Sequence, residues 1–292
     1  MSAQRQERAL LLARIVRQFE QRVNEFLEFS ESHPEASFGD LEAEAARLSR
    51  DCFASALQYS IEAQRERIER EWRCECGESP VYKGDQSRGQ ESYVGRIEVH
   101  RAYYYCSACG KGSYPLDVVR GIASGQFSEN VQNGICRLGV GLPFEPAAET
   151  FMALTGIGVS PREVQRLTEG RGGVLEEHLA QGRAKLLSVE ATVPARSSPD
   201  DGGVWAVSLD AARARFEDGW HDVKAAVVFR ARPKVSEGRL DGAQADRQSY
   251  VAEVGPMEKA GQRLYAEAVS RGVDPAEDLV ICLGDGAPVN WS

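Results

Sequence analysis

The sequence predicts a multidomain α+β protein, and three observations support this fold class. Two long helical patterns open the chain, and four cysteines then occur as two close pairs separated by residues with strand-like alternation. The C-terminal third alternates apolar and polar residues in several runs, with one helical pattern among them. A chain of 292 residues is long enough for more than one domain. We place the domains at residues 1–73, 74–120, 121–192 and 193–292.

The overall composition is that of a globular protein, with 42% hydrophobic and 27% charged residues. No apolar run approaches the roughly 18 residues that a membrane helix needs. The N-terminus, MSAQRQERALL, lacks the apolar segment of a signal peptide, so we expect a cytoplasmic protein with no membrane partner. The net charge of -9 argues against a protein that coats nucleic acid non-specifically, although a local basic groove is compatible with it.

The first domain is predicted to contain two helices. Apolar residues share one broad stripe over residues 9–27, and His33-Pro34 ends this pattern. The second helix is expected over residues 38–72. We expect the two helices to form an antiparallel hairpin that packs on the next domain, and the alternative is an oligomerisation arm.

Four cysteines form the strongest local motif. Each pair is followed by glycine: Cys74 and Cys76 precede Gly77, and Cys106 and Cys109 precede Gly110. Two thiolates followed by glycine are typical of a zinc knuckle, because the tight turn directs backbone N–H groups at the sulfurs. Two knuckles supply a closed tetrahedral Zn²⁺ site, which is structural rather than catalytic. The first pair is C-x-C, a tighter spacing than the usual C-x-x-C.

The residues between the two knuckles favour strands. Alternation over Tyr93–Val99, followed by Arg101–Tyr105, completes the pattern of a zinc ribbon. Seven cysteines, four of them clustered, indicate metal binding in a reducing compartment rather than a disulfide framework. Cys52, Cys136 and Cys282 lie in apolar patterns and are predicted to be core residues.

The third domain is predicted to be helical and contains a helix-turn-helix pattern. One helix begins at Pro143-Phe144, and residues 155–159 form a short turn that contains glycine. A second helix begins with Ser160 as its N-cap, Pro161 at its first position and a capping-box Glu163. In a helix-turn-helix the second helix enters the major groove, and the alternative is an ordinary helical hairpin. The residues expected to reach DNA are Arg162, Gln165 and Arg166.

The last domain follows a linker over residues 193–203, rich in Pro, Ser, Asp and Gly. Alternating runs over 204–216 and 223–229, separated by Asp218-Gly219, predict a β-hairpin. A polar loop over 238–246, a strand over 249–254, a helix over 256–271 and a strand over 278–283 are then expected. The order β-β-β-α-β is that of a ribonuclease-H-like fold, here an incomplete one.

Two aspartates lie on strands of this predicted domain. Asp210 falls in the middle of the first strand, where burial of a carboxylate is costly unless it is paired or binds a metal. Asp285 follows the fourth strand. The pair suggests a two-metal phosphoryl-transfer site, with the two aspartates on neighbouring parallel strands. The alternative is that each aspartate merely begins a turn.

The segments together resemble insertion-sequence transposases of the ISKra type. The resemblance covers about residues 74–287 and is carried by the knuckle followed by GKGSYPLD, by LPFEPAAETFMALTGIGVSPREVQRLTE, by the strand aspartate with GWHDVKAAVVF, and by LGDGA. It implies a DDE-type DNA transposase that binds element ends and target DNA, associates with the nucleoid and forms a homo-oligomer on DNA. Cleavage and strand transfer would use two Mg²⁺ or Mn²⁺ ions.

The resemblance places the first two catalytic, magnesium-binding acids at Asp210 and Asp285. The chain departs from the family pattern at Ala211, where glycine is usual, and in the segment PVNWS, where aromatic residues are usual. The family's third acid lies on a helix beyond the second acid, and we expect it beyond residue 292. Residues 1–292 are therefore expected to be inert in DNA cleavage. The alternative is a non-catalytic DNA-binding protein or regulator derived from a transposase.

Overall fold

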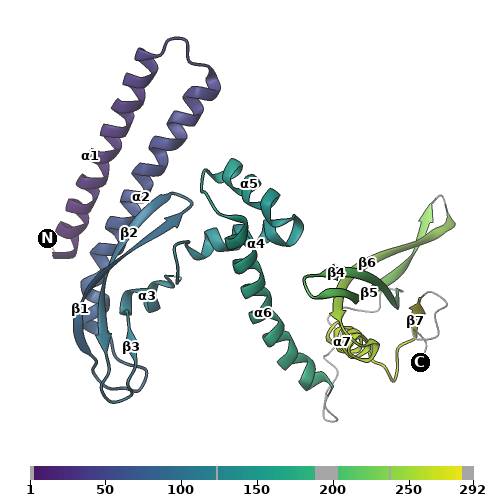
Figure 1. Cartoon of the computed structure of the whole chain (residues 1–292). Coiled ribbons are helices and arrows are strands. Elements are labelled where there is room, and N and C mark those ends of the chain that lie inside the picture. The colour runs from purple at the N-terminus through teal and green to yellow at the C-terminus, as the bar shows by residue number, and fades with distance from the viewer. Residues whose placement is uncertain (1–2, 123, 188–202, 237, 285–292) are drawn as a thin grey trace. The chain divides into compact units, whose positions relative to one another are not determined.

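A computed structural model describes residues 3–122, 124–187, 203–236 and 238–284. These residues form seven helices and two β-sheets, which confirms the mixed α and β composition predicted from the sequence (Figure 1). The chain divides into two compact units, Met1–Gly172 and Gly173–Ser292. None of the helices in the described ranges combines the length and the apolar character needed to span a membrane.

The N-terminal hairpin consists of α1 (Ala3–Ser32) and α2 (Phe38–Glu71). α2 begins with a capping box: the Asp40 N–H donates to Ser37 Oγ (3.3 Å), and the Ser37 N–H donates to the Asp40 carboxylate (2.9 Å). α1 extends beyond the predicted residues 9–27 at both ends, because the polar residues that flank the apolar stripe are helical too. It ends just before His33-Pro34, as expected.

The first sheet is antiparallel, with strands in the order β1 (Val81–Ser92), β2 (Gly95–Tyr105) and β3 (Gly112–Ser113). The two strands predicted over 93–99 and 101–105 are in fact one strand, β2, and Tyr93-Val94 form the turn before it. β1 was not predicted, because its polar, glycine-containing sequence shows no apolar alternation. The short helix α3 (Pro115–Arg120) follows β3.

Helix α2 packs on this sheet, as expected for the N-terminal hairpin. The shared core joins α2, β2 and α3 and consists of Ala54, Ile68, Ile97, Val99 and Leu116. Backbone groups of β2 also use α2 side chains: the Glu98 N–H donates to Gln58 (3.2 Å) and the Ala102 N–H donates to Glu69 (3.2 Å).

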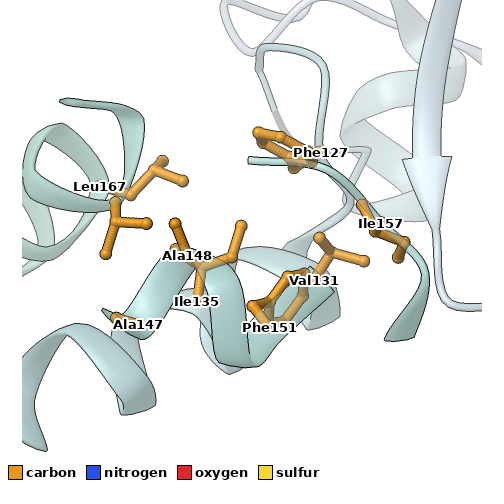
Figure 2. Packing of buried hydrophobic residues seen from close by; sticks show 9 residues of the cluster. Phe127, Val131, Ile135, Ala147, Ala148, Phe151, Ile157 and Leu167 are labelled. Carbon is orange, nitrogen blue, oxygen red and sulfur yellow. The ribbon is translucent and has the colours of Figure 1, made fainter. Parts of the chain in front are cut away.

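Three further helices form the remainder of the first unit and continue into the second. They are α4 (Glu129–Gly141), α5 (Phe144–Thr155) and α6 (Pro161–Leu186). Their common core gathers side chains from all three helices and from the segment before α4 (Figure 2). Its buried members are Phe127, Val131, Ile135, Ala147, Ala148, Phe151, Ile157, Val164 and Leu167.

Two glycines position these helices. Gly156 ends α5 in the left-handed conformation (φ 70°), and its N–H donates to the Met152 carbonyl (2.8 Å). Gly134 on α4 allows close approach of Tyr93 from the β1–β2 turn, since a Cβ there would lie 2.1 Å from the Tyr93 hydroxyl. The first sheet therefore packs directly against the three-helix region.

The second unit contains a four-stranded sheet. Its strands are β4 (Val204–Phe216), β5 (Gly219–Ser236), β6 (Arg239–Val254) and β7 (Val280–Leu283), in the order β6-β5-β4-β7. Helix α7 (Met257–Ser270) precedes β7 and packs on β5 and β6. β7 is parallel to β4, as predicted for the strands of the two aspartates, and the other pairs are antiparallel.

Two local predictions in this unit were wrong. Residues 238–246 are not a loop, because β6 begins at Arg239 and pairs with β5 from Ser236 onward. The side chains of this segment are mostly polar, so its sequence shows no apolar alternation that would predict a strand. The β4–β5 turn is formed by Glu217-Asp218, and Gly219 already pairs with Phe216 at a φ of 132°.

Candidate functional site

The four cysteines predicted as zinc ligands come together in the first unit. Their Sγ atoms all lie within 4.8 Å of one another, and none belongs to a disulfide. Cys74 Sγ is 3.5 Å from Cys109 Sγ, and Cys76 Sγ is 3.6 Å from Cys106 Sγ. Four sulfurs around tetrahedral Zn²⁺ at about 2.3 Å would be separated by about 3.8 Å. The cluster therefore has the donor set and the size of a structural zinc site.

The local backbone explains why the sulfurs converge. The Gly77 N–H donates to the Cys74 carbonyl (2.8 Å), and the Gly110 N–H donates to the Cys106 carbonyl (2.9 Å), which closes one tight turn in each knuckle. Both glycines have positive φ, 90° and 71°, where a side chain would be strained. Cys106 directly follows the last residue of β2, and its N–H donates to the Lys111 carbonyl (2.9 Å).

The thiols influence one another's ionisation. The backbone N–H groups of Cys109 and Ala108 lower the pKa of Cys106 to about 7. For Cys76, the N–H of Glu78 lowers the pKa, but hydrogen bonds with the neighbouring thiols, Cys74 first, outweigh it and raise the pKa to about 12. The Cys106 thiol thus loses its proton more easily than usual and the Cys76 thiol less easily. Four neighbouring sulfurs cannot all become negatively charged without a cation between them. With all four ligands supplied by protein, a bound Zn²⁺ would keep no open position for a substrate.

The remaining three cysteines divide between core and surface. Cys52 is buried, as predicted, and Cys136 packs partly buried against the three-helix core. Cys282 is exposed, so its predicted place in the core is wrong. It lies on β7, which is an edge strand of its sheet, and an apolar sequence pattern does not reveal that position.

The helix predicted to recognise DNA begins where the sequence indicated. α6 starts at Pro161, and the Glu163 N–H donates to Ser160 Oγ (3.2 Å). Val164 and Leu167 are buried in the three-helix core, whereas Arg162 and Arg166 are exposed. The first turns of α6 thus present two arginines on the side of the helix away from the core.

Two of the three predicted DNA-contacting side chains have partners on their own helix. Arg166 donates to Glu163 through Nε (2.8 Å) and Nη2 (2.5 Å), and this guanidinium lowers the pKa of the Glu163 carboxyl. Gln165 is partly buried and donates to Glu169 (2.9 Å). Such exposed pairs are weak, about 0.2–1 kcal/mol, so a phosphate group would displace Glu163 from Arg166 readily.

Asp210 lies on β4 opposite Ala225 of β5, but its side chain is exposed rather than buried. Its carboxylate accepts a hydrogen bond from the Ala211 N–H (2.8 Å). The expectation of a costly buried carboxylate is therefore wrong, because the hydrophobic core of this unit covers only the first half of β4, around Trp205. Asp285 lies outside the described residues.

The single acidic residue of β5, Asp222, does not join Asp210 in a cluster. Asp222 accepts a hydrogen bond from Arg213 instead (3.1 Å). Within the described ranges, the cysteine cluster is the group in which three or more His, Cys, Asp or Glu side chains converge as metal ligands could.

Sequence reasoning missed two charged networks. Arg101 is buried on β2, pairs with Asp117 of α3 and stacks over the Tyr114 ring at 4.1 Å. Alternation along β2 could have located it, since Arg101 shares a strand face with buried Val99.

In the second unit, Arg263 of α7 joins Glu176 of α6 (2.7 Å) to Glu253 of β6. The sequence does not predict this network, because Glu176 lies far from Arg263 along the chain.

Comparison with protein-family models yields no match, and the curated proteins also contain no match to this chain. A function is therefore inferred from its own residues and their geometry.

Proposed function

We propose that this chain comprises the DNA-binding part and part of the catalytic domain of a DDE-type insertion-sequence transposase. The observation that carries the proposal is the register of two parallel strands, in which Ser208 of β4 lies opposite Leu283 of β7. Asp210 follows Ser208 by two residues, and in the sequence Asp285 follows Leu283 by two residues. Equal sequence spacing from a paired position supports the proposal that the two aspartates act together rather than as two unrelated turn residues.

The chemistry of these acids suits phosphodiester cleavage and joining. Mg²⁺ and Mn²⁺ prefer oxygen ligands, and aspartates satisfy this preference. Two such ions, when bound, activate the attacking oxygen and stabilise the leaving oxygen of a phosphodiester. The exposure of Asp210 supports this role, because its carboxylate is accessible to a hydrated cation and to a DNA strand.

The first unit would supply the DNA contacts. The zinc site would fix the first sheet, which packs on α4 through Tyr93, and the three-helix core would orient α6. Arg162 and Arg166 suit phosphate oxygens, and Gln165 suits a base edge. Protein of net charge -9 needs such local basic positions to approach DNA.

Replacing Arg162 and Arg166 together with alanine should weaken DNA binding about tenfold or more and reduce the salt dependence of binding by about two units of slope. The reason is the loss of two phosphate contacts and of the counterions they release. The measurement is fluorescence anisotropy on duplexes selected from a random library, between 50 and 200 mM NaCl (roughly the range over which such contacts dominate).

Arg47→Ala is the matched control for this experiment. Arg47 is an exposed helical arginine paired with Glu44 three residues earlier, as Arg166 is paired with Glu163. Arg47→Ala should leave both the DNA affinity and the salt dependence of DNA binding unchanged. If the double variant bound selected duplexes as tightly as the natural chain, α6 would not be the recognition helix.

Asp210→Asn should lower the affinity of the chain for Mn²⁺ by at least about tenfold, because loss of a residue that merely supports a metal ligand already costs about 10–100-fold. The readout is the loss of free Mn²⁺ electron paramagnetic resonance signal on titration with zinc-loaded protein. Asp222→Asn serves as the control, because this exposed carboxylate on the neighbouring strand already pairs with Arg213. Equal Mn²⁺ binding by both variants and by the natural chain, with DNA binding intact, would favour a non-catalytic DNA-binding regulator.

A further inference from the structure

The α1–α2 hairpin carries a long apolar face that the described part of its own unit leaves exposed. On α1 the face consists of Leu12, Val16, Phe19, Val23 and Leu27, and Phe53 continues it on α2. Phe19 is 54% exposed and Phe53 is 56% exposed. Contiguous apolar surface of this kind marks an interaction site more often than scattered exposed side chains do.

Packing against α2 leaves much of helix α1 exposed. Among the described side chains of this 30-residue helix none is buried, whereas α2 buries four. The partly buried Leu11 and Ile15 are separate from the exposed stripe, which recurs at intervals of three and four residues. A helix with two adjacent apolar stripes is typical of a bundle in which it packs against more than one neighbour.

The exposed face is hollowed where the two helices meet. Phe19, Val23 and Phe26 of α1 and Leu48 and Phe53 of α2 line an open cavity of about 170 Å³, and its walls are almost entirely apolar. A cavity of this kind accepts large apolar side chains from outside the hairpin. The exposed stripe on α1 itself consists of apolar side chains. One hairpin therefore carries both the cavity and the apolar side chains that could fill the same cavity of a second copy.

We propose that this face binds the same face of a second copy, so that two hairpins form a four-helix bundle with the two copies of α1 antiparallel. The charge distribution along α1 determines the direction. Residues 3–18 contain four arginines and one glutamate, and residues 19–32 contain four glutamates and one arginine. Antiparallel copies place each basic half beside an acidic half, whereas parallel copies would place like charges together.

A two-fold arrangement uses one patch on both copies, which fits a face that is complementary to itself. The stripe is also nearly symmetric about Phe19: in antiparallel copies Leu12 lies near Leu27 of the partner subunit, and Val16 lies near Val23 of the partner subunit. The dimer is independent of the proposed function, because it needs neither DNA nor the aspartates. Its failure would leave the DNA-binding and metal-binding predictions standing.

Sedimentation velocity of the full zinc-loaded chain without DNA tests this interface. The natural chain should sediment as a dimer at concentrations of about 20 µM, and Phe19→Glu with Val23→Glu should raise the dimer dissociation constant about 100-fold or more, since both side chains lie at the centre of the face. Circular dichroism and zinc content should not change, because both residues are exposed in the single chain. Val140→Glu with Leu154→Glu, apolar positions elsewhere in the unit that are even more exposed, should leave the dimer intact.

The direction of pairing has its own test. Glu28→Arg with Glu31→Arg makes the acidic half of α1 basic and should weaken an antiparallel dimer about tenfold. A parallel dimer would not be weakened, because the net charges of residues 19–32 that face each other there would change from −3 and −3 to +1 and +1, which lowers their repulsion. A natural chain that stayed monomeric at ~100 µM would overturn the proposal, as would a folded Phe19→Glu, Val23→Glu protein with undiminished dimerisation. If that variant unfolds, Phe53→Lys on α2 tests the same face with α1 unchanged.

Discussion

Cys106→Ser will abolish stoichiometric zinc binding and unfold the three-stranded sheet. The natural chain should contain one zinc ion, held by the four convergent thiols. Cys106 is buried, and β3, which pairs with β2 next to this knuckle, contains only two residues. Structural Zn²⁺ contributes about 10–16 kcal/mol of apparent binding free energy in small zinc domains, which is as large as the whole stability of a typical domain.

The measurement combines metal analysis of the purified chain with far-ultraviolet circular dichroism before and after treatment with a chelator. Cys282→Ser is the matched control, since Cys282 is exposed and lies in the other unit, and it should retain one zinc ion per chain. Reduced, folded natural protein without zinc would show that the four thiols have another purpose. Loss of zinc should also loosen α2, because Ile97 and Val99 of β2 form the core beneath it.

Elements with a strong periodic signal could be predicted from the sequence. The helices over 38–72 and 256–271, the capped start of α6 at Ser160 and the strand over 204–216 are all present within a few residues. The second strand of the hairpin is also present, but it extends well beyond the predicted 223–229, to Gly219–Ser236. In each case the apolar period, a cap or a turn residue is local and therefore visible in the sequence. The same holds for the cysteine cluster, whose spacing with glycine already specifies two tight turns.

Features set by tertiary surroundings could not be predicted. β1 and the outer part of β6 are polar strands that exist because a neighbouring strand pairs with them, not because they bury a face. The sequence around Asp210 suggests burial because the residues before and after it are apolar, but the hydrophobic core of this unit ends before Asp210. The sequence pattern places the exposed and the partly buried apolar residues of α1 on one broad stripe, since sequence periodicity does not reveal how many neighbours a helix has.

Phe127→Ala will lower the free energy of unfolding of the first unit by about 3–5 kcal/mol, the usual cost of removing a fully buried phenylalanine. Phe127 is 1% exposed and contacts the core formed by α4, α5 and the start of α6. Its neighbours also hold the sheet to this core: the Glu91 N–H donates to the Gln126 carbonyl (2.6 Å), and the Ser128 N–H donates to the Glu91 carbonyl (2.9 Å). A cavity here therefore loosens both the sheet and the three helices.

The same substitution should weaken the proposed DNA binding even though Phe127 is buried away from solvent. Arg162 and Arg166 are held in place through Val164 and Leu167, which pack in the core that Phe127 completes. Urea unfolding followed by circular dichroism gives the stability change, and anisotropy on the selected duplexes gives the change in affinity. Leu154→Ala, on exposed surface of α5, should change stability by no more than about 0.5 kcal/mol. A loss of less than about 1 kcal/mol for Phe127→Ala would mean that the helices stay together without this side chain, and that α6 is oriented by other contacts.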